Sequence, residues 1–242
     1  MTRSSNSFAA FPPIEAALDD PNGLLAVGGD LSVQRLVNAY SLGIFPWYEA
    51  NQPLLWWSPD PRAILRRQQL HVSRSLKRTM RRHNYTLTMD RAFPDVVEQC
   101  AKARSSGDGT WITAAMQQAY SELHEAGYAH SFEVWSDTRL VGGIYGVAVG
   151  QIFSGESMFH RETDASKIAF VLCSCYLSAM DWPVLDCQLM NPHLASLGAE
   201  EISRAQFKQL LPGYSLKPGQ LAPPAWPGLR WHDCHSLLDQ LQ

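Results

Sequence analysis

Acidic residues are absent from one stretch of a chain in which acids otherwise outnumber bases. The 242 residues include 23 Asp and Glu against 20 Lys and Arg, a formal net charge of −3. The charge of the whole chain predicts no polyanionic partner, whereas the cations of the acid-free stretch predict one. Residues 61–89 contain no Asp or Glu and hold Arg62, Arg66, Arg67, Arg74, Lys77, Arg78, Arg81 and Arg82.

Several other absences limit the class of protein. The hydrophobic content of 45% excludes a disordered or low-complexity chain. The 5 Cys include no C-x-x-C pair, so we expect a reducing compartment and no disulfide framework. Residues 1–7 lack the apolar core of a secretory signal, and the longest apolar-rich stretch, residues 168–180, is too short to span a bilayer. We therefore expect a cytoplasmic protein without membrane contact.

Motifs for common cofactors and nucleophiles are also missing. The glycine-rich segment 142–146 lacks the full G-x-G-x-x-G of a dinucleotide site, and no G-x-S-x-G nucleophile elbow occurs. His232, Cys234 and His235 match no standard metal-ligand spacing. A dinucleotide site and a metal site are therefore not expected.

Proline and glycine patterns divide the chain near Asp60. Residues 1–60 are rich in Pro, Gly and Trp and predict a small turn-rich N-terminal domain with one helix, which Ser32 is expected to cap. Residues 61–242 predict an α+β domain, a mixed sheet with flanking helices, in which Asp164 caps the helix over 165–180. Strands are expected near 63–65, 85–89, 130–135, 151–159 and 184–188, and the proline-rich tail 212–242 is expected to form an extended strap.

A stripe of cations follows one face of the helix expected over 73–83. Positions i, i+3, i+4 and i+7 share a face, so repulsion along the stripe destabilises the helix slightly unless an anion covers it. A solvated face with acids elsewhere in the fold is the alternative. The lack of acids over the whole stretch favours a nucleic-acid phosphate backbone. The stripe consists of Arg74, Lys77, Arg78 and Arg81.

Polar side chains interrupt two apolar strands. Glu156 lies within 152–159, a strand otherwise expected to be buried. Asp186 and Gln188 lie within 184–190, two residues apart and hence on one face of a strand. A carboxylate in such surroundings is paired, or its pKa rises, and such groups gather at functional sites. A purely structural acid bonded to backbone amides or an arginine is the alternative.

Eight segments together resemble the bacterial leucyl/phenylalanyl-tRNA–protein transferases. Each is weak alone, but they occur in order between residue 11 and about residue 204. They are Pro-Asn-Gly-Leu-Leu-Ala-Val-Gly-Gly-Asp-Leu (21–31), Gly-Ile-Phe-Pro-Trp-Tyr (43–48), Leu-Trp-Trp-Ser-Pro-Asp-Pro-Arg (55–62), Gly-Thr-Trp-Ile-Thr (109–113), Ala-His-Ser-Phe-Glu-Val-Trp (129–135), Gly-Glu-Ser-Met-Phe (155–159), Ala-Ser-Lys (165–167) and Asp-Cys-Gln (186–188).

The resemblance implies a reaction and a fold. Members of this family move Leu or Phe, and less readily Met, from aminoacyl-tRNA to the α-amine of a protein that begins with Arg or Lys, which marks that protein for degradation. The larger domain is expected to resemble the GCN5-type acyltransferase fold, with the small domain before it. No metal or organic cofactor is implied, and we expect a monomer.

The resemblance also suggests roles for individual residues. Trp47 and Trp111 would stack on the terminal adenosine of the tRNA. Asp186 would draw the proton from the attacking amine through Gln188, and Glu156 would anchor the α-amino group of the aminoacyl moiety; alternatively, Asp186 would pair electrostatically with the acceptor. The amino-acid side chain would enter an apolar pocket lined by Ile144, Phe153, Met158, Phe170, Cys173 and Leu177.

Two of these pocket residues depart from the family pattern. Ile144 stands where Met is expected, and Cys173 stands where Phe is expected. Both changes make the pocket wall smaller or less adaptable, so the preference between Leu and Phe does not follow from the resemblance.

Two rival functions remain open from the sequence. An acyl-CoA-dependent N-acyltransferase on the same fold would carry a pyrophosphate-binding loop, which residues 159–165 do not offer. A non-catalytic RNA-binding adaptor would use the cationic stripe but leaves the acids in apolar strands unexplained.

Overall fold

The computed structural model describes residues 10–105, 111–214, 221–226, 228 and 231–241. Within these residues seven strands form one mixed sheet in the order β10-β4-β9-β8-β7-β6-β5. The sheet is antiparallel except between β8 and β9, which run parallel. Its strands are β4 (Arg62–Arg66), β5 (Thr86–Met89), β6 (Ala129–Ser136), β7 (Arg139–Val149), β8 (Ile152–His160), β9 (Val184–Gln188) and β10 (Glu200–Ile202).

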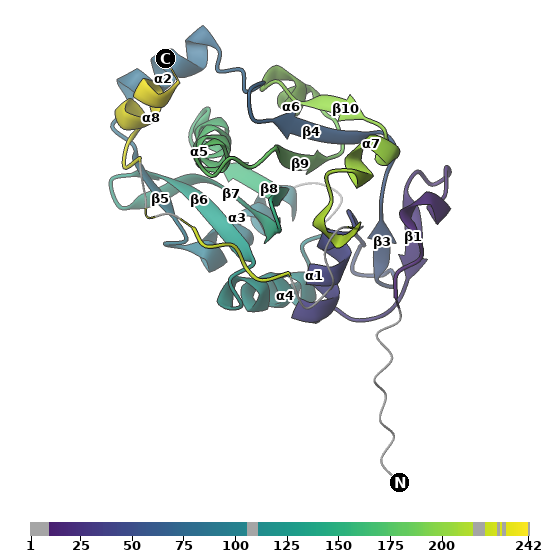
Figure 1. Cartoon of the computed structure of the whole chain (residues 1–242). Helices are drawn as coiled ribbons and strands as arrows, with labels where there is room; N and C mark the ends of the chain where they lie inside the picture. The colour runs from purple at the N-terminus through teal and green to yellow at the C-terminus, as the bar shows by residue number, and fades with distance from the viewer. Residues whose placement is uncertain (1–9, 106–110, 215–220, 227, 229–230, 242) are drawn as a thin grey trace.

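Helices cover both faces of this sheet, as Figure 1 shows. One face packs against α5 (Ala165–Ala179), with α2 (Arg74–Arg82) and α8 (Cys234–Gln240) beside it. The opposite face packs against α1 (Val33–Ser41), α3 (Phe93–Ser105) and α4 (Ala114–Glu125). The apolar residues of each face form their own buried cluster. The chain therefore has the α+β architecture predicted from the sequence.

The N-terminal part adds a small antiparallel sheet. Its strands, in the order β1-β3-β2, are β1 (Leu24–Val27), β2 (Phe45–Pro46) and β3 (Leu55–Trp57), preceded by the short helix η1 (Ile14–Ala16). Leu36 and Tyr40 of α1 belong to the same buried cluster as Tyr120 of α4. The N-terminal part and the larger sheet therefore share one core. Figure 1 places β1 and β3 at the end of the molecule opposite to α2 and α8.

The parallel pair β8–β9 opens partway along its length. Pairing runs from Ile152↔Val184 to Ser154↔Asp186 and then stops. Beyond that point β8 stays paired with β7, where the register skips Glu156 between Gly155 and Ser157, so that Glu156 forms a β-bulge. On β9, Gln188 turns the chain with a φ of 62°. The carboxyl ends of two parallel strands thus separate, which is where ligand sites commonly form in sheets of this kind.

The tail differs from the expected strap. Residues 221–226 are extended, but the chain then forms the helix α8, which begins at a capping box between Asp233 and Ser236 and buries Cys234, Leu237 and Leu238. The short elements α6 (Pro192–Ser196), α7 (Arg204–Lys208) and η2 (Pro212–Tyr214) were not predicted either. The proline content favoured an extended tail. However, the apolar residues at 234, 237 and 238 have helical spacing, so a helix buries them on one face.

Two residues predicted as helix caps occupy the N-cap position but do not form the capping hydrogen bond. Ser32 and Asp164 occupy the N-cap positions of α1 and α5, yet neither side chain accepts a capping hydrogen bond. The Ser32 N–H donates instead to the Asp30 carboxylate, and Asp164, with a φ of 66°, turns its carboxylate toward Lys167 and Thr79.

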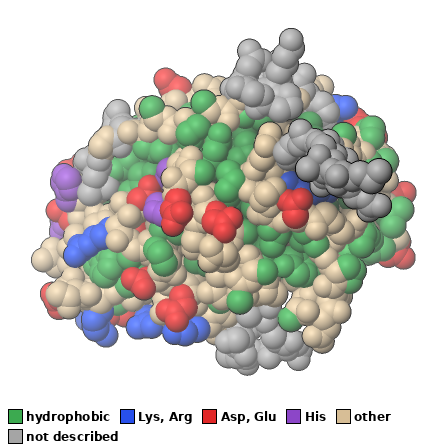
Figure 2. All heavy atoms as spheres, turned by 90° about the horizontal axis from the view of Figure 1, so that it is seen from below, with side chains coloured by type: hydrophobic (Ala, Val, Ile, Leu, Met, Phe, Trp, Pro, Cys, Tyr) green, Lys and Arg blue, Asp and Glu red, His purple; other side chains and the backbone are tan. Residues whose placement is uncertain are grey.

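The surface is unevenly charged. On the face seen from below in Figure 2, Asp and Glu side chains are spread among hydrophobic and uncharged ones, while Lys and Arg gather mostly along one margin. Within the described part of the chain, no helix combines the length and the hydropathy needed to cross a bilayer.

Candidate active site

A pocket of about 300 Å³ occupies the opening between β8 and β9. Strands β2, β7, β8 and β9, helix α5 and the segment around α6 all contribute to its wall, so it joins the N-terminal part to the larger sheet. Its lining consists of Phe45, Pro46, Trp47, Trp111, Ile144, Gly155, Glu156, Ser157, Met158, Phe170, Leu185, Cys187, Gln188, Leu189, Asn191, His193 and Leu194.

Three of the six residues predicted to form an apolar pocket lie at this one. Ile144, Met158 and Phe170 line the pocket, together with Glu156. These residues come from β7, β8 and the first half of α5, which meet at the open end of the parallel pair. These residues lie on only part of the wall, because β2 and the segment around α6 also contribute to it and were not predicted.

Three predicted lining residues lie elsewhere. Phe153 packs its ring against Phe132 and Trp226 in the core, with ring centroids 5.8 and 6.3 Å away. Cys173 is fully buried, and Leu177 lines a separate shallow hollow with Arg67 and Trp182. The reason is the rise of the helix: Leu177 lies seven residues beyond Phe170 and therefore about 10 Å further along α5, past the pocket.

Leu185 and Cys187 were missed as lining residues. Cys187 follows Asp186 on β9, and its side chain borders the pocket whereas that of Asp186 does not. The alternation of β9 would have placed the Leu185 and Cys187 side chains on one face of the strand. What the alternation does not reveal is which face opens into a cavity.

Two tryptophans stand at the pocket from distant parts of the chain. Trp47 follows β2 and is 43% exposed, while Trp111 precedes α4 and is half-buried. Trp57 packs against the Trp47 ring at 5.7 Å and donates its Nε1–H to the Trp47 carbonyl at 2.6 Å. An exposed indole held in this way offers a stacking surface to a planar group.

Glu156 is a buried acid with two donors. Its Oε2 accepts from the Tyr120 hydroxyl at 2.5 Å, and its Oε1 accepts from the Gln188 Nε2 at 2.8 Å. Burial, assisted by the charge of Asp186, raises the pKa of Glu156 to about 7, while the hydrogen bonds lower it. The carboxyl group therefore changes charge near neutral pH, within reach of a ligand in the pocket.

Asp186 has a different environment and does not line the pocket. Its carboxylate accepts from Arg62 Nε and Nη2 at 2.8 and 2.7 Å, from Ser154 Oγ at 2.9 Å and from the backbone N–H of Gln188 at 3.0 Å. Both Asp186 and Arg62 are only 1% exposed. The carboxylate is thus neutralised and saturated with donors.

This geometry corrects the predicted proton path. The bond between Asp186 and Gln188 involves the Gln188 backbone, whereas the Gln188 side-chain amide points to Glu156. Among the described residues, no hydrogen bond joins the Gln188 side-chain amide to Asp186. The sequence could not show that Asp186 is already paired, because its partner Arg62 lies 124 residues away along the chain.

Comparison of the sequence with models of protein families identifies the family of the chain. The model described as "Leucyl/phenylalanyl-tRNA protein transferase" matches residues 64–212, and the model of that family's N-terminal domain matches residues 29–60. The chain belongs to this family. It is therefore an aminoacyltransferase, as the resemblance implied.

Individual relatives agree with the family match. Proteins described as leucyl/phenylalanyl-tRNA–protein transferases are 52% identical in a Shewanella species and 54% identical in Methylococcus capsulatus. The alignments cover 92% and 90% of this chain and 93% and 92% of those proteins. Among solved structures, that of L-PGS from Bacillus licheniformis covers 63% of this chain and 50% of its own, with 12% identity and a TM-score of 0.40, which is too low to support an argument.

The cationic stripe of this transferase lies on α2. Leu76 and Met80 bury the opposite face of the helix, while Arg74, Arg78 and Arg81 are exposed and Lys77 is half-buried. None of the four forms a salt bridge with a described residue. The four cations therefore have no ion-pair partner among the described residues, although the Asp164 carboxylate contacts α2 at Thr79.

The stripe connects to the pocket through the start of α5. Thr79 of α2 donates its hydroxyl to the Asp164 carboxylate at 3.2 Å, and Asp164 is the N-cap residue of α5. Phe170, which lines the pocket, lies six residues further along, a rise of about 9 Å. Lys167 adds another cation between them, 34% exposed. The first turns of α5 therefore link α2 to the pocket wall.

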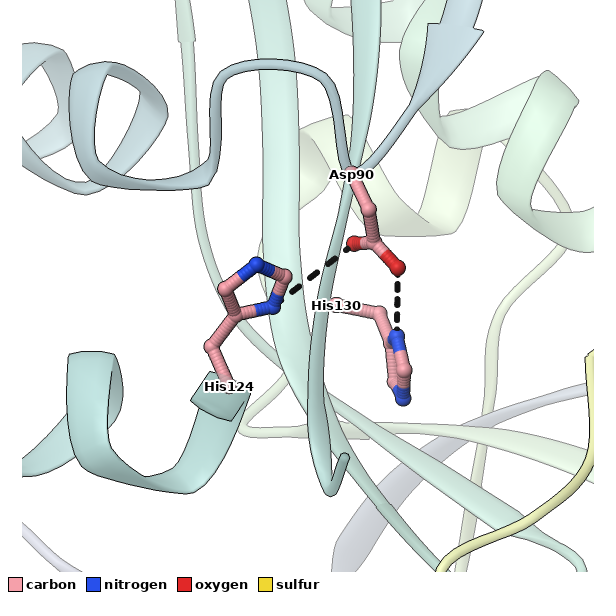
Figure 3. A group of neighbouring side chains, drawn as sticks. All are labelled: Asp90, His124 and His130. Atoms are coloured by element: carbon pink, nitrogen blue, oxygen red, sulfur yellow. Dashed lines mark hydrogen bonds and ion pairs between the residues drawn. The ribbon is translucent and has the colours of Figure 1, made fainter. Parts of the chain in front are cut away.

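A second polar cluster could in principle hold a metal ion. Asp90, His124 and His130 place three potential ligand atoms within 4.8 Å of one another, with Asp90 between the two imidazoles (Figure 3). However, the Nδ1 of His130 lies 2.7 Å from Asp90 Oδ2, and the Nδ1 of His124 lies 2.8 Å from the Ala129 carbonyl. Both nitrogens thus have hydrogen-bond partners.

The same cluster forms hydrogen bonds with the C-terminal segment 221–226. Trp226 donates its indole N–H to His130 Nε2 at 2.8 Å, so that a chain of hydrogen bonds runs from Trp226 through His130 to Asp90. Tyr128 adds a bond from its hydroxyl to the Leu221 carbonyl at 2.7 Å. The cluster therefore has a structural explanation without a metal.

Proposed function

We propose that this chain transfers Leu or Phe, and less readily Met, from aminoacyl-tRNA to the α-amine of proteins that begin with Arg or Lys, and thereby marks them for degradation. The observation that carries the proposal is the composition of the pocket. An apolar hollow ends at the polar pair Glu156 and Gln188, and two tryptophans stand at its wall. A monomeric state and a cytoplasmic location remain predictions.

The hollow accounts for the choice of amino acid. Ile144, Met158 and Phe170 offer an apolar surface, and the methionine thioether adapts to side chains of different shape. A side chain unbranched at Cβ enters such a hollow without a clash near the backbone. Rejection of Ile and Val by shape alone is worth about 1–3 kcal/mol per misplaced methylene.

Trp47 and Trp111 account for recognition of the tRNA end. Stacking on an aromatic side chain contributes about 1–3 kcal/mol per base and is tolerant of sequence. The α2 stripe would hold the phosphates of the acceptor stem, an interaction that neutralises charge without reading bases. Together they allow several tRNAs to deliver their amino acid to one pocket.

The chemistry needs positioning more than activation. The aminoacyl ester of the ribose is already reactive toward an amine, so the protein must bring the two together and exclude water. Gln188 orients the reacting carbonyl and amine, and Asp186, fixed by Arg62, holds the Gln188 backbone in its turn. Asp186 thus acts on the reaction through Gln188, as a positioning residue.

A transfer assay tests the proposal. Purified protein is incubated with tRNA charged with radiolabelled Leu or Phe and with a peptide that begins with Arg, or the same peptide beginning with Glu. Label is expected on the Arg peptide and not on the Glu peptide. Tight tRNA binding with no transfer to either would identify an RNA-binding adaptor, and acylation of the peptide from acyl-CoA would identify the rival N-acyltransferase.

A further inference from the structure

Among the described residues that line the pocket, Glu156 is the only carboxylate. We propose that Glu156 takes up the proton that the attacking amine releases, and that Tyr120, held by Tyr40, is a positioning residue that orients the Glu156 carboxylate. This inference rests on the proposed function, because it names the proton acceptor of the same reaction. It gives Glu156 a catalytic role in place of the anchoring role expected from the sequence.

Other groups near the pocket are poor proton acceptors. Asp186 lies behind the wall, with its carboxylate bound by four donors. Burial raises the pKa of the Cys187 thiol far above its ordinary value, so that the thiol stays protonated. His193 also lines the pocket, but burial lowers the pKa of its imidazole below the ordinary value, so it is a weaker base than Glu156.

A chain of hydrogen bonds supports the Glu156 carboxylate from behind. The Tyr40 and Tyr120 hydroxyls lie 3.0 Å apart, and Tyr120 donates to Glu156 Oε2. Burial, and then the charge of Glu156, raises the pKa of both tyrosines well above the ordinary value. Both hydroxyls therefore keep their protons. Tyr120 can only donate to Glu156, and Tyr40 can satisfy the remaining acceptor of Tyr120.

The carboxylate is held but not saturated. Tyr120 donates to Oε2, Gln188 donates to Oε1, and Tyr40 adds a further hydrogen-bonding interaction with the carboxylate. Three donors leave at least one lone pair of the two oxygens for a further proton. Of the other groups facing this network, Asp186 is neutralised by Arg62, and Tyr145 packs edge-on against Tyr120 at 5.2 Å. A pKa of about 7 makes Glu156 an effective base near neutral pH.

The proton balance of the step is complete without a further reactant. The amine nitrogen attacks the ester carbonyl carbon, a C–N bond forms, and the nitrogen loses one proton to the Glu156 carboxylate. The C–O bond to the ribose then breaks. The ribose oxygen leaves as a hydroxyl group by taking the proton back from Glu156, so that the enzyme returns to its starting state.

Single-turnover rates of Leu transfer to the Arg peptide, measured against pH, test this inference. The wild-type rate is expected to rise with pH in two steps, through about 7 as Glu156 is deprotonated and through about 8 as the peptide α-amine is deprotonated. Glu156→Gln should remove the lower step, leave the upper one, and lower the rate by about 10²–10⁴-fold. Tyr120→Phe keeps the base but removes a hydrogen bond that stabilises its charged form. The lower step should therefore move up by about one pH unit.

A matched control and a binding measurement separate the outcomes. Tyr85→Phe removes another tyrosine–glutamate hydrogen bond, to Glu162 at 2.8 Å and outside the pocket, and should leave the pH profile unchanged. Asp186→Asn should lower the rate at every pH without removing the lower step. The affinity for aminoacyl-tRNA, measured by filter binding, should stay within about threefold in all variants.

The contrary results are equally specific. If the lower step survives in Glu156→Gln but disappears in Asp186→Asn or His193→Gln, the proton acceptor has been misassigned. If Tyr120→Phe lowers the rate equally at all pH values, its role is structural only. A wild-type protein that transfers nothing would overturn the proposed function itself, whereas normal transfer by Glu156→Gln would overturn this inference alone.

Discussion

Removal of the Arg62 side chain is expected to destabilise the fold strongly. Arg62→Met leaves the Asp186 carboxylate buried without its bidentate partner, at 2.8 and 2.7 Å in the native chain. Breaking one side of a fully buried ion pair typically lowers the free energy of unfolding by about 3–5 kcal/mol. Arg62 also donates to the Gly43 carbonyl and lies over the rings of Phe45 and Phe207, so the loss reaches the N-terminal part as well.

Urea unfolding followed by tryptophan fluorescence measures this change, and thermal unfolding should show a fall in Tm of about 6–20 °C. Arg66→Met is the matched control, because Arg66 lies on the same strand and pairs with Glu200, but both side chains are well exposed, at 45% and 37%. That variant should lose less than about 1 kcal/mol.

A double substitution completes the test. Combining Arg62→Met with Asp186→Leu removes both charges and should recover most of the stability lost in the single variant, because no unpaired charge is then buried. A loss below about 1 kcal/mol in Arg62→Met, or no recovery in the double variant, would refute the reasoning that this pair is held in a dry environment.

Further predictions concern the stripe, the pocket, the tail and Glu156. Replacing the four stripe cations with Gln should raise the KM for tRNA far more than it lowers kcat and should flatten the salt dependence; an unchanged KM would show that the phosphates lie elsewhere. Gly155→Val adds side-chain volume where a Cβ is already 3.7 Å from Ile144 and Leu185, and should reduce transfer of Phe more than of Leu; equal loss would contradict this pocket floor. Trp226→Phe removes the bond to His130 and should lower the free energy of unfolding by about 1 kcal/mol, with no change expected if the tail is not docked. Because burial raises the pKa of Glu156 in the folded state, wild-type stability is favoured below about pH 4.5 and this contribution is lost as pH rises through about 7; Glu156→Gln should therefore gain stability relative to wild type from pH 5 to pH 8, and a constant difference would contradict the raised pKa.

Local patterns predicted most of the larger sheet. The strands expected near 130–135 and 151–159 lie within β6 and β8, and the helix expected over 73–83 is α2, whose N-cap Ser73 accepts a hydrogen bond from the Leu76 N–H. These features depend on neighbours within a few residues of one another, which a sequence displays directly.

The arrangement of the site could not be predicted fully, because it depends on contacts between residues far apart in the sequence. Polar residues in apolar strands drew attention to Glu156 and Asp186, but did not show which of them faces the pocket. That depends on the bulge at Glu156 and on the position of Arg62, whose charge was interpreted as part of the cationic surface. A bulge and an ion pair between distant strands leave no periodic trace in the sequence.

The rates at which one tRNA delivers different amino acids test the central claim most directly. The same tRNA body is charged with Leu, Phe, Met, Ile or Val, and single-turnover transfer to the Arg peptide is measured for each. The account predicts rapid transfer of Leu and Phe, slower transfer of Met, and transfer of Ile and Val at least about tenfold slower than Leu, because branching at Cβ clashes at the pocket entrance. Equal rates for all five would contradict the claim that the hollow between β8 and β9 holds the amino-acid side chain.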